Sequence, residues 1–242
     1  MRIVAIVQAR MGSQRLPGKV LKPLGGVPML WHTLKRLERV PEIHEIVLAT
    51  SDLKQDDLLA DFADEERIPV FRGSEGDVLE RYYLAARTFK TDAVIRITGD
   101  CPFIDPEITR KTIRSFLEEK VDYASNVLDR TFPRGTDTEV FSFHALEKAY
   151  QEGSRPEDRE HVTYYMRTNP EKFKLKGIRS EKDLSYIRHC VDVEEDYLFV
   201  QALFYHLAGR NMFFTTSDIE RELRRSPWLA TINGNVQQKP IP

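Results

Sequence analysis

Three cationic side chains and two glycines follow the first apolar run of the chain. Residues 3–7 predict a buried strand, and the loop after it contains Arg10, Arg15 and Lys19. Arginine donates in a planar fork that matches phosphate oxygens, and lysine adds a compact charge. The loop lacks the G-x-x-x-x-G-K-[ST] spacing of the common phosphate loop. We nevertheless expect a nucleoside-triphosphate site, with backbone N–H groups contributing, at Ala9, Arg10, Gly12, Ser13, Arg15 and Lys19. The alternative is a solvated loop whose cations are incidental.

Two aspartates stand where predicted strands end. Asp100 follows residues 93–97, and Asp192 follows residues 187–191. Mg²⁺ prefers one or two carboxylates together with phosphate oxygens, so this pair predicts a metal site. In the alternative interpretation Asp100 only orders the turn. Asp196, one helical turn after Asp192, suits capping of the next helix or binding of a backbone N–H.

Polar residues elsewhere suit a polyhydroxylated or carboxylated substrate. They occur in residues 134–139 and 159–161, and Arg72-Gly73 and Arg81 follow another strand end. Arg81 could instead pair with Asp77 four residues earlier, and a single histidine on a helix is more often structural. We expect Arg72 and Gly73 on the nucleotide side, and on the substrate side Arg81, Asp137, Glu139, Arg159 and His161.

Strand and helix patterns alternate over the first half of the chain. Strands are predicted over residues 3–7, 45–49, 69–71, 93–97, 123–126, 139–143 and 187–191. Helices are predicted over residues 28–40, 55–66, 77–89, 106–117, 159–167, 194–207 and 217–224. This order predicts an α/β fold, with a mostly parallel sheet and helices on both faces. Residues 1–242 read as one domain, with a smaller lobe at about residues 125–185.

Composition narrows the class of protein. The chain has 242 residues, of which 41% are hydrophobic and 31% charged, and its formal net charge is −2. The absence of a basic block argues against nucleic acid as a partner. No apolar run approaches the roughly 20 residues of a membrane span, and no secretory signal opens the sequence. Two cysteines, Cys101 and Cys190, fit a reduced, cytoplasmic setting, where they act as small buried apolar residues.

Taken together, these motifs resemble the cytidylyltransferases that activate acidic sugars, such as the CMP-Kdo and CMP-sialate synthetases. The opening pattern A-R-x-G-S-x-R-L-P-G-K matches residues 9–19. The sequence is still more similar to the spore-coat polysaccharide biosynthesis F proteins. Their pattern covers nearly the whole chain, at residues 8–13, 71–74, 77–83, 96–100, 137–141 and 159–163.

The resemblance implies a GT-A-like (Rossmann-like) nucleotide-binding fold, Mg²⁺ dependence and the reaction CTP + acidic sugar → CMP-sugar + pyrophosphate. It also implies a homodimer joined through the smaller lobe and a role in surface or spore-coat polysaccharide synthesis. The family's triphosphate contacts fall on Arg10, Arg15 and Lys19, and its metal aspartates on Asp100 and Asp192. We expect Arg15, Lys19 and Asp100 to be catalytic. Thr98 and Cys101 depart from the pattern of the Kdo synthetases, so the residues that bind the sugar do not transfer.

Two other functions fit part of the sequence. One is a GT-A-type glycosyltransferase that consumes a nucleotide-sugar, although Asp100-Cys101-Pro102 lacks the second aspartate of an Asp-x-Asp motif. The other is a non-catalytic nucleotide-binding subunit, against which the complete set of Arg10, Lys19, Asp100 and Asp192 argues.

Overall fold

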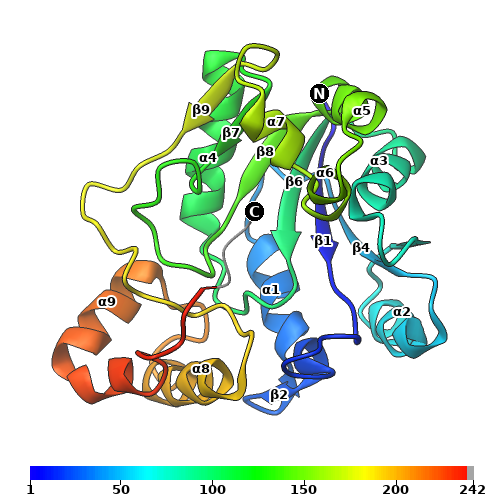
Figure 1. Cartoon of the computed structure of the whole chain (residues 1–242). Coiled ribbons are helices and arrows are strands. Elements are labelled where there is room, and N and C mark those ends of the chain that lie inside the picture. The colour runs from blue at the N-terminus through cyan, green and yellow to red at the C-terminus, as the bar shows by residue number, and fades with distance from the viewer. Residues whose placement is uncertain (239–242) are drawn as a thin grey trace.

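A seven-stranded sheet runs through the centre of the molecule (Figure 1). The structure is a computed structural model that describes residues 1–238, so residues 239–242 of the predicted domain lie outside the described part. The strand order is β5-β4-β1-β6-β8-β7-β9. The strands are β1 (Ile3–Gln8), β4 (Glu45–Ser51), β5 (Val70–Gly73), β6 (Ala93–Thr98), β7 (Tyr123–Ser125), β8 (Glu139–Ser142) and β9 (Leu175–Gly177).

The sheet is mostly parallel, as predicted. Within the described chain β8 runs antiparallel to its neighbours β6 and β7, and the other neighbouring pairs are parallel. A separate two-stranded ribbon joins β2 (Pro23–Leu24) to β3 (Val27–Pro28). The β6–β8 register places Arg96 directly opposite Glu139.

Helices cover both faces of the sheet because β1 is apolar on both sides. Its residues Ile3, Ala5 and Val7 face one core, and Val4 and Ile6 face the other. The first core is closed by α1 (Met29–Leu37), α2 (Asp57–Glu65) and α4 (Pro106–Glu119). The second is closed by α3 (Val78–Thr88), α5 (Phe143–Glu152) and α7 (Tyr164–Thr168). The predicted α/β class with helices on both faces is confirmed.

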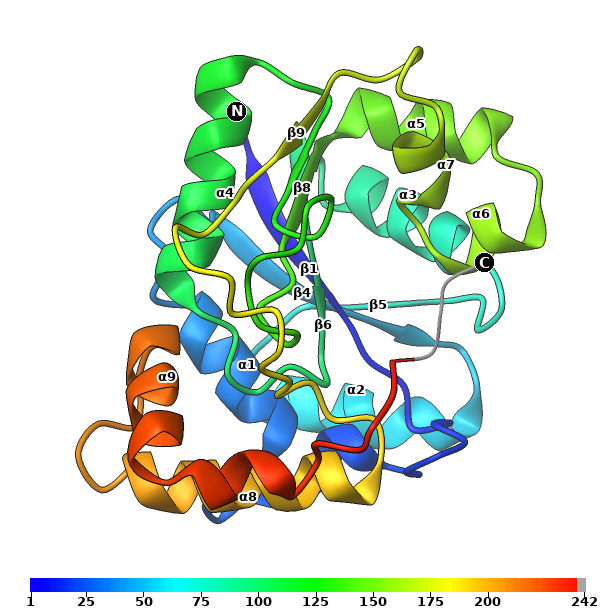
Figure 2. The ribbon, with the colours of Figure 1, turned by 60° about the vertical axis from the view of Figure 1, so that its left-hand side comes forward.

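A third apolar cluster lies beyond the carboxyl ends of the strands (Figures 1 and 2). It joins α8 (Glu194–Leu207) and α9 (Thr216–Arg225) to the ribbon residue Leu24 and to Phe103, which follows β6. A last short 3-10 helix, Pro227–Thr231, packs on both helices. The cluster brings the segment before α8 to the same edge of the sheet as the loop after β1.

Two predicted elements are wrong. Residues 187–191 form no strand of the described sheets, because Ile187 and His189 bond to the backbone of Arg134 and leave only an isolated bridge. The helix predicted over residues 159–167 is divided into α6 (Pro156–Glu160) and α7. The break falls at Val162, whose φ of 38° no α-helix accommodates. Helix α5 and strand β9 were not predicted.

Residues 125–185 contribute to the main sheet as well as to its surroundings. β8 and β9 pair within the central sheet, while α5, α6 and α7 pack beside α3. A sugar-binding or dimer-forming role for this segment stays a prediction. No helix in the described residues is both long enough and apolar enough to cross a membrane.

Candidate active site

The two aspartates predicted to hold a metal ion meet at one lysine. Asp100 follows β6, Asp192 precedes α8, and Lys19 begins the 3-10 helix Lys19–Leu21 after the first loop. Lys19 Nζ lies 2.6 Å from Asp100 Oδ2 and 2.9 Å from Asp192 Oδ1. It also donates to the carbonyl oxygen of Val191 at 2.7 Å. A single ammonium group thus joins three segments that are distant in the sequence.

Close packing beneath this cluster explains the glycine before Asp100. A Cβ at Gly99 would lie 2.9 Å from Leu30 Cδ1 and 3.1 Å from Ala9 Cβ. The backbone N–H of Gly99 donates to the carbonyl oxygen of Gln8 at 2.8 Å. The end of β6 can therefore approach the end of β1, which sets the position of Asp100 relative to Lys19.

Opposite charge holds the cluster ionised in spite of burial. Lys19 is only 8% exposed, and burial alone would lower its pKa, yet Asp100 and Asp192 raise that pKa above its ordinary value. Burial would raise the pKa of Asp192, but Lys19, Arg188 and Arg15 lower it to about 2. Lys19 and Asp192 are therefore both charged at neutral pH.

The loop after β1 presents its two arginines to solvent beside this cluster. Arg15 Nη2 lies 3.2 Å from Asp192 Oδ1, and Arg10 Nη1 lies 3.7 Å from Glu75 Oε1. The fully buried Asp56 fixes the loop by accepting a hydrogen bond from the backbone N–H of Met11 at 2.7 Å. Ala9 is buried at the start of the loop, whereas Gly12 and Ser13 are partly exposed.

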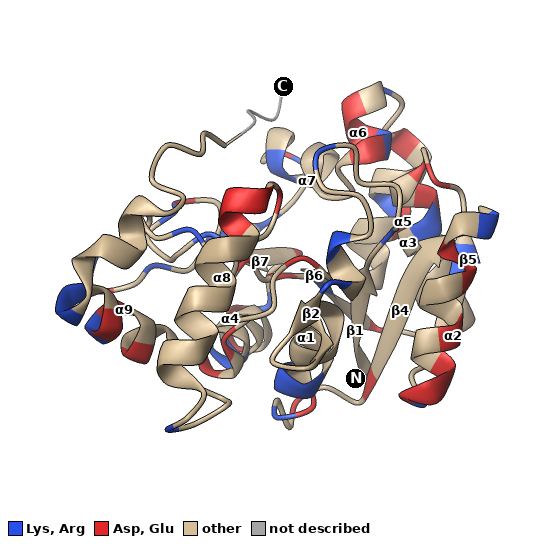
Figure 3. Cartoon of the chain, turned by 90° about the horizontal axis from the view of Figure 1, so that it is seen from below, with Lys and Arg blue, Asp and Glu red and all other residues tan. Residues whose placement is uncertain are grey.

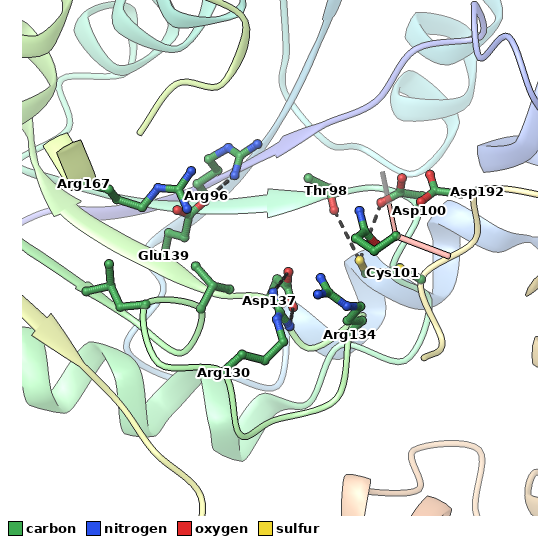
Figure 4. A pocket seen from close by; sticks show the side chains of 14 residues that line it. Arg96, Thr98, Asp100, Cys101, Arg130, Arg134, Asp137, Glu139, Arg167 and Asp192 are labelled. Atoms are coloured by element: carbon green, nitrogen blue, oxygen red, sulfur yellow. Dashed lines mark hydrogen bonds and ion pairs between the residues drawn. The ribbon is translucent and has the colours of Figure 1, made fainter. Parts of the chain in front are cut away.

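A cavity of about 500 Å³ opens from Asp100 and Asp192 along β6 and β8 (Figure 4). Charged and polar side chains of both signs dominate its wall. It is lined by Arg96, Thr98, Asp100, Cys101, Val127, Leu128, Arg130, Arg134, Asp137, Glu139, Arg167, Cys190, Asp192 and Gln238.

Two of the predicted substrate residues lie in this cavity, and each has an arginine partner. Asp137 forms a bidentate pair with Arg130, with both N–O distances at 2.7 Å. Glu139 pairs with Arg96 across the β6–β8 ladder. It also accepts hydrogen bonds from the hydroxyls of Tyr123 and Thr163, at 2.5 and 2.7 Å. Both carboxylates are therefore held in place before any ligand arrives.

Arg72 and Gly73 lie at the end of β5, apart from the cavity. Arg72 donates to Asp57 at 2.6 Å and to the carbonyl oxygens of Ser51 and Leu53, so its guanidinium secures the end of the neighbouring strand. A nucleotide-binding role for these two residues stays a prediction.

Arg81, Arg159 and His161 do not line the cavity either. Arg81 is buried and donates to the carbonyl oxygen of Ser74 at 2.5 Å. The alternative that it pairs with Asp77 is wrong, because the Asp77 carboxylate binds Arg159 at 2.5 and 2.8 Å. His161 follows α6, and burial lowers its pKa below the ordinary value. A direct role for these three in substrate binding stays a prediction.

Sequence reasoning missed most of the arginines of the cavity. Arg96 carried a usable signal, because it is a charge inside the apolar run 93–97 and shares a strand face with Thr98. Arg134 belonged to a polar run that was noted as a whole. Arg130 lies in a segment with no regular pattern and Arg167 at the end of a predicted helix, and only the tertiary structure brings them to the cavity.

The two cysteines line the same cavity. Cys101 and Cys190 are free thiols, next to Asp100 and two residues before Asp192. Burial raises the pKa of both thiols above the ordinary value. They are therefore protonated at neutral pH and serve as small, weakly polar parts of the wall.

Acidic residues gather at the first turn of α8, immediately after Asp192 (Figure 3). Asp196, the third of them, accepts hydrogen bonds from the backbone N–H groups of Asp192 and Val193 at 3.0 and 3.4 Å. It also binds Arg188, which in turn reaches Asp192 at 2.8 Å. Asp196 thus caps the helix and orients Asp192, in agreement with the capping alternative.

Comparison with known proteins decides the family. The family model described as Cytidylyltransferase matches residues 4–217. The chain belongs to this family. The cytidylyltransferase is 34% identical over 244 residues to the spore coat polysaccharide biosynthesis protein SpsF of Bacillus subtilis, covering 95% of this chain and 97% of that protein. It is 36% identical over 241 residues to an uncharacterized protein, MJ1063, of Methanocaldococcus jannaschii, covering 99% and 97%.

A solved structure agrees over the whole chain. The cytidylyltransferase superimposes on a cytidylyltransferase from Leptospira borgpetersenii with a TM-score of 0.91 at 33% identity, covering 99% of this chain and 100% of that one. The expected family of acidic-sugar cytidylyltransferases and the nucleotidyltransferase class are confirmed. The enzyme is therefore a nucleotidyltransferase, and the site at Lys19, Asp100 and Asp192 lies at the strand ends where such a fold binds ligands.

Proposed function

We propose that the enzyme transfers a cytidylyl group from CTP to a hydroxyl of an acidic sugar, with Mg²⁺ and release of pyrophosphate. The observation that carries this proposal is the meeting of Asp100 and Asp192 at one cation, beside a loop with two further cations and at the mouth of an arginine-rich cavity. The loop suits a triphosphate, and the cavity suits a sugar that bears negative charge.

The donor set fits a magnesium ion. Two carboxylate oxygens already converge on a cation-sized group, the Lys19 ammonium, at 2.6 and 2.9 Å. The described residues contain no group of three or more His, Cys, Asp or Glu side chains arranged to hold a metal ion. A site with two carboxylates that is completed by phosphate oxygens and water is the arrangement that Mg²⁺ prefers. Asp100 and Asp192 would hold the ion, which would offset charge on the α-phosphate.

In the reaction the sugar oxygen forms a bond to the α-phosphorus, and the bond from that phosphorus to the bridging oxygen of pyrophosphate breaks. The hydroxyl proton leaves to solvent or to a carboxylate at the mouth of the cavity. Arg10, Arg15 and the N–H groups of Gly12 and Ser13 would hold the leaving pyrophosphate. Lys19 would turn from the carboxylates to the phosphate oxygens. Positioning and electrostatic stabilisation account for the rate enhancement.

The cavity suggests where the sugar lies. Asp137 and Glu139, held by Arg130 and Arg96, would accept hydrogen bonds from sugar hydroxyls, and Arg134 would add positive charge to the wall that faces an acidic sugar. We also propose a homodimer formed through residues 125–185, which light scattering on the purified chain tests. A role in surface or spore-coat polysaccharide synthesis and a cytoplasmic location follow from the same proposal.

Nucleotide binding is the first test. Thermal unfolding is measured with CTP, UTP, GTP and ATP, each with Mg²⁺, on the wild type, Asp100→Ala and the exposed control Asp61→Ala. A ligand at about 100 times its dissociation constant adds roughly 2.7 kcal/mol of stability. We expect CTP alone to stabilise the wild type and Asp61→Ala, and we expect Asp100→Ala to lose this effect.

Product analysis separates cytidylyl transfer from glycosyl transfer. With CTP and a panel of acidic sugars, we expect pyrophosphate and a CMP-sugar. Release of a nucleoside diphosphate from a nucleotide-sugar would instead identify a glycosyltransferase. Binding of CTP with no turnover of any acidic sugar would identify a non-catalytic subunit.

A further inference from the structure

The end of the cavity that lies away from Asp100 and Asp192 is built around Glu139. Arg96 pairs with it from β6, and the side chain of Arg167 extends toward it from α7 (Figure 4). Although burial would raise the pKa of Glu139, Arg96 and Arg167 lower it to about 2. Two guanidinium groups and one carboxylate therefore share this end, which leaves one positive charge in excess.

At this end of the cavity, as far as the structure describes it, Arg167 is the cation without a hydrogen-bonding or ion-pair partner. Among the described residues no carboxylate, carbonyl or hydroxyl lies within bonding distance of its guanidinium, and its Nε is buried without a hydrogen bond. Glu139 already binds Arg96, Tyr123 and Thr163. An uncompensated guanidinium in a partly buried wall is costly unless a ligand neutralises it.

Two other carboxylates of the cavity are already paired and do not compensate Arg167. Asp137 forms a bidentate ion pair with Arg130. Asp192 forms ion pairs with Lys19, Arg188 and Arg15. Arg36 is almost completely buried, and its guanidinium has a structural role because it binds backbone carbonyl oxygens. It donates to the carbonyl oxygens of Phe214 and Met212 at 2.8 and 3.0 Å. Arg167 has no such bonds.

This end is well separated from the reacting end. Arg96 and Asp100 lie four positions apart, and β6 rises about 7 Å from Arg96 to its last residue, Thr98, before the turn to Asp100. Figure 4 places Arg96, Glu139 and Arg167 at one end of the cavity and Asp100 and Asp192 at the other, so a group bound at Arg167 would lie several bonds from a hydroxyl that reacts at Asp100 and Asp192.

We propose that Arg96 and Arg167 form a subsite for an anionic oxygen group of the sugar, a carboxylate or a phosphate, several bonds away from the reacting hydroxyl. This inference rests on the proposed function, since it concerns the sugar of that same site. The substrate class is then a sugar with a remote acid group, such as a uronic acid or a sugar phosphate. A sugar whose single carboxylate adjoins the reacting hydroxyl would leave Arg167 unpaired.

Small sugars test the subsite without knowledge of the natural substrate. Binding of D-glucuronate, D-glucose 6-phosphate, neutral D-glucose and 2-keto-3-deoxygluconate is measured by ligand-observed NMR, with and without CTP. In 2-keto-3-deoxygluconate the carboxylate adjoins the anomeric hydroxyl. We expect the wild type to bind at least one of the two remote anions at least tenfold more tightly than D-glucose and 2-keto-3-deoxygluconate. Which anion is preferred identifies a carboxylate or a phosphate as the natural group.

Three variants assign the preference to Arg167. Arg167→Met should abolish it while CTP binding is unchanged, and Arg167→Lys should keep part of it. The exposed control Arg179→Met should keep all of it. If Arg167→Met fails to fold, Arg167→Lys alone tests the assignment, because its preference for the remote anion should be weaker than that of the wild type. Equal binding of charged and neutral sugars, a stronger preference for 2-keto-3-deoxygluconate, or a preference that survives in Arg167→Met would overturn the proposal. If the wild type does not bind CTP at all, the proposed function itself is refuted, whatever the sugars show.

Discussion

Lys19 Nζ lies 2.6 Å from Asp100 Oδ2, so the ammonium group occupies the position between two carboxylates where a divalent cation would be expected to bind. The pairing is explained by charge, because two partly buried carboxylates repel each other unless a cation lies between them. A residue predicted to bind phosphate and a residue predicted to bind metal are thus each other's partners.

Replacing Lys19 by methionine should destabilise the fold and transfer the stabilising role to a metal ion. Removing one partner of a buried ion pair costs about 3–5 kcal/mol, because the remaining charge is left uncompensated. We expect Mg²⁺ to raise the melting temperature of Lys19→Met more than that of the wild type. Thermal unfolding with and without an excess of Mg²⁺ measures the difference. An identical response of both proteins would contradict this role of Lys19.

Acid should unfold the protein partly through Glu139. Its folded-state pKa of about 2 lies below the ordinary value of 4.5, so its contribution is complete above pH 4.5 and is lost as the pH falls toward 2. A shift of this size corresponds to a contribution on the order of 3 kcal/mol. Urea unfolding of Glu139→Gln between pH 5 and about 2.5 should show a shallower decline in the free energy of unfolding than the wild type. Parallel declines would rule this contribution out.

Arg15 should affect turnover without affecting stability. Its side chain is 44% exposed and touches Asp192 at 3.2 Å, and an exposed pair of this kind contributes at most about 1 kcal/mol. By analogy with the loss of an oxyanion donor, Arg15→Ala should lower kcat by about 10²–10³. The control is Arg114→Ala, a side chain of similar exposure on α4. Pyrophosphate release and melting temperature are measured on both, and an equal loss of activity in both would argue against a specific role.

Gly99→Ala should disturb the site through packing alone. The new Cβ would meet Leu30 and Ala9 at 2.9 and 3.1 Å, and overpacking of this kind costs about 1–3 kcal/mol. Gly209→Ala is the matched control, because nothing lies within 4 Å of a Cβ there. We expect a lower melting temperature and weaker CTP binding only in Gly99→Ala. A neutral result would show that the end of β6 can move away from β1.

Much of the fold could be predicted because local pattern and global topology agree in the first half of the chain. Alternating apolar strands and amphipathic helices predicted a mostly parallel sheet, and polar residues after its first and fourth predicted strands marked Lys19 and Asp100. Asp192 was predicted as well, although the segment before it is not a strand. The second half is different. Val162 breaks a periodic helix through a positive φ, and residues 187–191 bond to a loop rather than to a strand.

The wall of the cavity could not be predicted for a related reason. Arg130 and Arg134 lie in the loop between β7 and β8, and Arg167 lies on a short helix, so no spacing in the sequence relates them. Their neighbours are fixed by long-range contacts such as the bond from Leu184 N–H to the carbonyl oxygen of Thr131. Glu139 was predicted because it ends the polar run 134–139, but its pairing with Arg96 depends on the antiparallel register of β8.

That register has an evolutionary consequence. Arg96 and Glu139 are tied to the main-chain ladder of β6 and β8, where a slip of one residue would turn both side chains to the opposite face. Residues 126–138, in contrast, form a loop that can change length and composition without moving the ladder. Related enzymes can therefore evolve specificity for new substrates through substitutions and length changes in residues 126–138, while the paired strands β6 and β8 stay the same.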